Sequence, residues 1–140
     1  MGLLDRKKLL TKQALKIEKV DLENDDYVYV RQMTGRERDN YEQSLRRKIE
    51  GKNGVADYEL ALENFRAKLA VNTVCDEKGD LILHLSDYEV LSDNMSAFTL
   101  EKIINVAQRL NNITEEDKEG LVKNSVAAQS GDSILDSARS

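Results

Sequence analysis

The sequence predicts a mainly α-helical protein, a small helical bundle with an N-terminal β-hairpin as its minor α+β content. Helices are favoured because apolar residues recur at helical spacing in several segments and the chain of 140 residues contains no proline. The hairpin is favoured because residues 27–30 alternate tyrosine with valine, which suits a half-buried strand. A chain of this length buries one modest core, so we expect one folded unit.

Residues 1–25 are predicted to form a basic N-terminal arm that ends in the first strand of the hairpin. Residues 1–20 contain six lysines or arginines and two acidic residues, although the whole chain has a net charge of −5. We expect a short helix over residues 4–14, an extended segment after it and a turn at residues 23–26. The arm lacks aromatic side chains for base stacking, so a solvated helix face is favoured over contact with nucleic acid.

A helix is predicted from Thr34 to about Glu50. Thr34 and Glu37 have the spacing of a capping box, in which each side chain bonds the backbone N–H of the other residue. Residues 51–54 contain two glycines and are expected to end this helix. The residues that recur every four positions on its apolar face are Tyr41, Leu45 and Ile49.

Two further helices carry the strongest apolar stripes, so they predict the core. The first begins at Asp57, and the second begins at Asp93 or Ser96 and ends at Asn111. The residues predicted to form the core are Leu62, Phe65, Leu69, Leu100 and Ile104. Packing of these helices is expected to hold residues 26–124 together as one helical domain.

Shorter elements complete the expected order. Residues 75–83 contain a glycine turn and an apolar run, which form either a second small hairpin or an ordered loop. Ser86 is expected to cap a short helix through Leu91, and Thr114 is expected to cap a final helix to about Lys123. Residues 125–140 have no aromatic side chain and no clear period, so we expect a flexible C-terminal tail.

No arrangement of residues predicts catalysis, a cofactor or a metal site. The single cysteine, Cys75, and the single histidine, His84, match no zinc spacing, and a packed thiol with a surface imidazole is favoured over a nucleophile and its base. Residues 76–80 resemble a calcium loop only superficially, because Lys78 stands where a ligand belongs. The glycines are isolated, so no phosphate-binding loop is expected. We therefore expect a protein that is not an enzyme.

Protein binding is the favoured class of function, because the distinctive features that remain are surface features. A lone cysteine and the lack of a long apolar stretch predict a cytoplasmic protein with no membrane role. Arginine is enriched at interfaces, although an ordinary solvated face is the simpler explanation for any single residue. The candidate partner-binding residues are Tyr29, Arg31, Arg36, Arg38, Arg46 and Arg47.

Three stretches of the sequence resemble the tail assembly chaperones of long-tailed bacteriophages. They are residues 29–38 (YVRQMTGRER), 65–79 (FRAKLAVNTVCDEKG) and 105–111 (NVAQRLN). The resemblance covers residues 26–124, whereas residues 1–25 match poorly. It implies a mainly helical protein of the host bacterial cytoplasm that binds the tape measure protein and tail tube subunits before assembly, without joining the finished virion. A longer form made by ribosomal frameshifting is common in that family.

The physical logic of such a chaperone agrees with the predicted apolar stripes. A tape measure protein is a long amphipathic helix, and apolar surface on a small helical protein can cover it transiently. Self-association is a further expected contact for a chain with a small core. The alternative function is a structural head-to-tail connector or tail completion protein, which would be retained in the virion and detected there.

Overall fold

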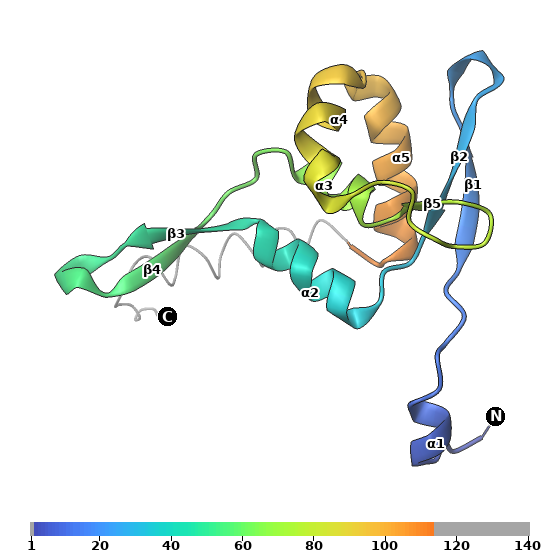
Figure 1. The fold of residues 1–140 in the computed structure, drawn as a ribbon, viewed down its shortest axis with the longest axis horizontal. Coiled ribbons are helices and arrows are strands. Elements are labelled where there is room, and N and C mark those ends of the chain that lie inside the picture. Colours follow the sequence, from blue (N-terminus) through green and yellow to red (C-terminus); the bar gives the residue numbers. More distant parts are fainter. Residues whose placement is uncertain (1, 114–140) are drawn as a thin grey trace, which may run out of the picture.

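The computed structural model describes residues 2–113, which form an α+β fold (Figure 1). The helices are α1 (Arg6–Leu9), α2 (Gly35–Ser44), α3 (Phe65–Val71), α4 (Tyr88–Asn94) and α5 (Ala97–Leu110). The strands are β1 (Ile17–Asp21), β2 (Tyr27–Arg31), β3 (Arg46–Glu50), β4 (Ala56–Leu60) and β5 (Val74–Cys75). They form two small antiparallel sheets in the orders β1-β2-β5 and β3-β4. The prediction of a mainly helical bundle is therefore wrong, because two segments expected to be helical pair with each other as strands.

The predicted N-terminal hairpin is confirmed. β1 and β2 pair antiparallel, with Val20 opposite Val28. At the turn, Asn24 and Asp25 have φ angles of 61° and 64°, a left-handed backbone that Asn and Asp adopt more readily than other non-glycine residues. β5 pairs with the other edge of β2, so β2 becomes the central strand of the sheet.

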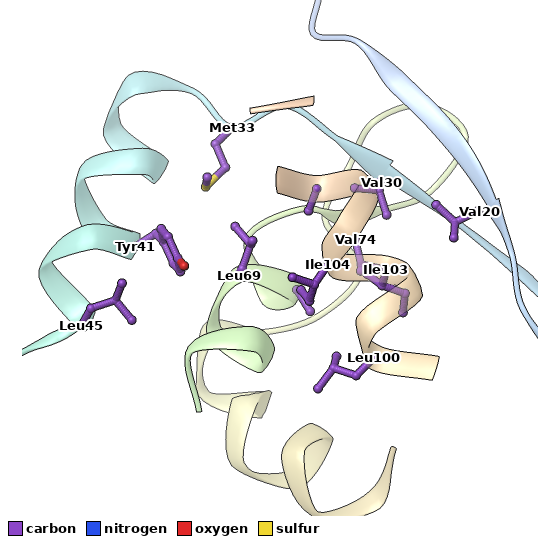
Figure 2. Packing of buried hydrophobic residues seen from close by; sticks show 12 residues of the cluster. Val20, Val30, Met33, Tyr41, Leu45, Leu69, Val74, Leu100, Ile103 and Ile104 are labelled. Carbon is purple, nitrogen blue, oxygen red and sulfur yellow. The ribbon is translucent and has the colours of Figure 1, made fainter. Parts of the chain in front are cut away.

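The core lies between this sheet and helices α2, α3 and α5, as Figure 2 shows. Leu69 and Ile104 are fully buried and Leu100 is buried, so these three core predictions are confirmed. Phe65 is partly buried and packs against the edge of the core. The prediction for Leu62 is wrong, because this residue lies in the loop between β4 and α3 and its relative exposure is 49%.

The second sheet replaces parts of two predicted helices. α2 ends at Ser44 instead of continuing to Glu50, and the segment that begins near Asp57 is strand β4 rather than a helix. Tyr41 and Leu45 are buried as predicted. A spacing of four residues fits one face of a helix and equally one face of a strand, so the local pattern did not distinguish the two.

The turn of the second hairpin explains where the predicted helix stops. Gly51 donates its backbone N–H to the carbonyl oxygen of Val55. A Cβ atom at Gly51 would collide with that same oxygen, so glycine is required for the close approach. Asn53 and Gly54 have φ angles of 60° and 74°, which complete the reversal. The chain therefore turns back on itself where a helix end was expected.

The ends of α5 agree with prediction. Ser96 Oγ accepts a hydrogen bond from the N–H of Thr99 at 3.1 Å, and Asn111 is the C-terminal cap.

Other predicted helices differ from the structure or lie outside it. The α4 helix starts at Tyr88 after a 3-10 turn, not after a Ser86 cap. α1 has four residues, none of which is buried, so the longer helix predicted over residues 4–14 is wrong. The helix predicted after residue 114 and the tail lie outside the described residues.

Residues 75–83 contain a very short β-pairing. Cys75 forms an isolated antiparallel bridge with Leu81 around the turn at residues 76–80. Asp76 Oδ1 accepts the N–H groups of Lys78 and Asp80 at 2.9 and 3.0 Å, and Gly79 has φ +94°. These side-chain hydrogen bonds from Asp76 stabilise the turn. Within residues 2–113, no helix has both the length and the apolar character to cross a membrane.

Candidate interaction site

Two stretches that carry the phage resemblance meet in space, where β2 leads into α2 beside the end of α5. Met33 donates its N–H to Asn111 Oδ1 at 2.7 Å, and Gln32 Nε2 donates to the carbonyl oxygen of Leu110 at 3.2 Å. Arg38 Nη1 donates to the carbonyl oxygen of Asn111 at 2.8 Å. The bonds from Gln32 and Arg38 satisfy backbone carbonyls that the end of α5 leaves open. The two stretches therefore hold the start of α2 against the end of α5.

A buried ion pair stabilises the same junction. Both terminal nitrogens of Arg31 donate to the Glu37 carboxylate at 2.9 Å, and the Arg31 side chain is only 7% exposed. Thr34 and Glu37 form the predicted capping box, with bonds of 2.9 and 3.2 Å. The hydrogen bond from Arg31 holds the pKa of Glu37 below its usual value. Arg31 is thus engaged inside the protein and is not available at its surface.

Tyr29 and Arg38, also predicted to bind a partner, lie within the folded framework. Tyr29 is half-buried on β2 and packs edge to face against Tyr27, with ring centroids 5.7 Å apart. Arg38 is partly buried between the Glu42 carboxylate, at 3.0 Å, and the end of α5. Both side chains have structural partners that explain their positions.

The remaining three predicted residues are exposed, but they do not share one helix. Arg36 lies in the first turn of α2 and makes no ion pair within residues 2–113. Arg46 and Arg47 lie on β3, so their predicted place on the helix after Thr34 is wrong. Arg47 Nε donates to Glu59 of β4 at 2.7 Å. The arginines therefore belong to two separate surfaces.

An apolar groove that the sequence did not reveal lies between the start of α3 and the meeting of α4 with α5. Its volume is about 280 Å³. Arg66 borders the groove and pairs with Glu101 at 2.8 Å. Five of the eight residues that line it are apolar, namely Leu62, Phe65, Met95, Ala97 and Leu100, and the other three are Asn64, Arg66 and Ser92. A helical stripe through Leu62 and Phe65 was detectable in the sequence, but only the fold shows that it opens to solvent instead of closing into the core.

Cys75 and His84, the two residues considered for a reactive site, lie in different surroundings. Cys75 is buried, and its burial raises the pKa of the thiol, which keeps it protonated at neutral pH. His84 is exposed at the start of the turn before α4. Burial also raises the pKa of Tyr41 to about 12. Residues 2–113 contain no cluster of three or more side chains suited to a metal ion.

Comparison with known proteins finds no match: no protein-family model, no curated protein and no solved structure matches this chain. Its function must therefore be inferred from its surfaces and from the resemblance of the three sequence stretches.

Proposed function

We propose that this protein is a tail assembly chaperone of a long-tailed bacteriophage or prophage, which binds the tape measure protein, tail tube subunits or both during tail morphogenesis. The observation that carries the proposal is the apolar groove between α3, α4 and α5. In this proposal the protein acts in the host bacterial cytoplasm and catalyses no reaction. Its role is to cover apolar surface on partners that would otherwise aggregate.

The groove suits one apolar side of an amphipathic helix. Leu62 and Phe65 supply one wall from the loop before α3 and its first residue, and Met95 and Leu100 supply the other. Phe98 is exposed on α5 outside the groove and adds apolar surface beside it. The Lys102 ammonium lies over the Phe98 ring, 4.8 Å from its centre. Helix-in-groove recognition uses apolar anchors spaced three or four residues apart, as in a long tape measure helix.

The shallow geometry supports a transient complex. A groove of about 280 Å³ accepts only one or two side chains, which limits the affinity of each copy. Weak binding at many positions along a long helix would cover it during synthesis and still permit displacement by tail tube subunits. A permanent connector would need a larger apolar interface.

Co-expression with the tape measure protein tests the proposal. We expect the soluble fraction of the tape measure protein to rise several-fold in the presence of this chain, and Leu62→Lys to abolish that rise. The matched control is Ile82→Lys, which changes an equally exposed apolar residue in the loop after β5, outside the groove. Both variants should retain the unfolding midpoint of the wild type, because both side chains are about half exposed.

Two results would reject the chaperone function. One is an unchanged solubility of the tape measure protein with and without this chain, together with tails of normal length when its gene is deleted. The other is stoichiometric recovery of this chain from purified virions, which would favour the head-to-tail connector or tail completion protein.

A further inference from the structure

The β3-β4 hairpin projects from the rest of the protein, as Figure 1 shows. It is a separate two-stranded sheet, and neither strand pairs with another strand within residues 2–113. An isolated two-stranded sheet is marginally stable in water, and an open strand edge is a template for another strand. The hairpin therefore offers backbone hydrogen-bonding groups that the described residues leave open.

The hydrogen bonds at the two ends of the hairpin show which groups these are. Gly51 donates to Val55 and Ala61 donates to Leu45, at the two ends of the hairpin. Hydrogen-bonded pairs alternate with non-hydrogen-bonded pairs along an antiparallel ladder. The backbone groups of the intervening even-numbered residues must therefore point outward. On β3 these residues are Arg46, Lys48 and Glu50, and on β4 they are Ala56, Tyr58 and Leu60. The Tyr58 N–H is not open, because it donates to Asp57 Oδ1 at 2.8 Å.

We propose that two copies of this chain associate through β3, paired antiparallel about Lys48, to form a four-stranded sheet across a twofold axis. This register uses all outward-facing groups of β3. It places Arg46 of each copy opposite the partner's Glu50. These two side chains are exposed and make no ion pair within the described part of the chain. Two complementary ion pairs per dimer favour this arrangement, and they outnumber the single repulsion between the Lys48 side chains.

The β4 edge is a poorer choice for the same symmetry. Pairing β4 with its copy about Tyr58 places Asp57 opposite the partner's Glu59, so acidic side chains face each other twice. Pairing β3 with the β4 of another copy removes this repulsion, but repetition displaces each copy by two strand spacings, roughly 10 Å. A folded domain of about 100 residues has a radius of gyration of roughly 13 Å, so copies displaced by only this distance would overlap. A closed dimer through β3 is therefore the arrangement that charge and size both allow.

The projecting position of the hairpin provides the necessary space. In Figure 1 the helices and the first sheet lie beyond one end of the hairpin. An antiparallel twofold pair places the second body beyond the opposite end of the shared sheet, which avoids a collision. The inference does not depend on the tail chaperone proposal, because it uses no residue of the apolar groove.

Sedimentation equilibrium of the full chain tests the proposal with proline variants of two residues that lie opposite each other. The outward N–H of Lys48 is needed for the dimer, whereas that of Tyr58 is not, and neither N–H belongs to the ladder within the hairpin. We expect wild type and Tyr58→Pro to reach the dimer mass as concentration rises, and Lys48→Pro to remain a monomer. Circular dichroism of all three proteins checks that the core stays folded.

Charge exchange provides a second test that does not depend on tolerance of proline. Arg46→Glu and Glu50→Arg should each weaken self-association about tenfold, because two cross-strand pairs per dimer become repulsive. An equimolar mixture of the two variants should recover the wild-type affinity as a heterodimer, and the double variant should recover it alone. A monomeric wild type at every soluble concentration, a dimeric Lys48→Pro, or no recovery in the mixture would overturn the proposal.

Discussion

Replacing Glu37 with glutamine removes the carboxylate that neutralises buried Arg31 while leaving the size of the side chain unchanged. The guanidinium would lose the opposing charge and one of its two hydrogen bonds of 2.9 Å, because the glutamine Nε2 cannot accept, and its own Nε is already buried without a hydrogen-bond partner within residues 2–113. Removal of one member of a buried ion pair costs roughly 3–5 kcal/mol. Because 25% of the Glu37 side chain is exposed, we expect a loss near the lower end, about 3 kcal/mol.

Urea unfolding followed by circular dichroism measures this loss as a change in the free energy of unfolding. The matched control is Glu42→Gln, the same substitution on the same helix. Glu42 pairs with Arg38 at 3.0 Å, but both side chains are about one-third exposed. A partly exposed pair four residues apart on a helix contributes only about 0.5 kcal/mol. Equal effects of the two substitutions would refute the role of Arg31 and Glu37 as the electrostatic lock between β2 and α2.

Three further outcomes follow from burial and charge. The hydrogen bond from Arg31 lowers the folded-state pKa of Glu37, so its contribution to stability is fully present above the unfolded-state pKa and is lost as the pH falls through the folded-state pKa. Glu37→Gln should therefore reduce the acid dependence of the urea midpoint. Leu69→Ala should cost roughly 2–5 kcal/mol in the same assay, whereas Leu62→Ala should cost under about 1 kcal/mol because Leu62 is half exposed; similar costs would contradict the described core. Cys75 should react with a thiol reagent at least tenfold more slowly in the native protein than in urea, because it is buried and its thiol pKa is raised, and fast native labelling would show that β5 is open.

The candidate interaction residues show what a local sequence pattern can predict about a protein surface and what it cannot. The sequence identified arginine as the distinctive charged residue around α2, but it could not tell which arginines face solvent. Arg31 turns inward because Glu37 lies within reach of both its terminal nitrogens. Arg38 is held by the end of α5, more than seventy positions away along the chain. The partners that decide exposure are therefore contributed by other elements, which a charge pattern cannot reveal.

Elements whose signals are local could be predicted from the amino-acid sequence alone. The Thr34 capping box, the Tyr-Val strand with its Asn24–Asp25 turn, and the start of α5 at Ser96 each depend on residues within a few positions of one another. Whether residues 46–60 form helix or strand depends on tertiary contacts, because apolar residues four apart suit one face of a helix and one face of a strand equally. Pairing across the Gly51 turn satisfies the backbone groups that the two strands direct toward each other, and that gain appears only when the two segments meet. The same pairing leaves Leu62 outside the core and thereby opens the groove.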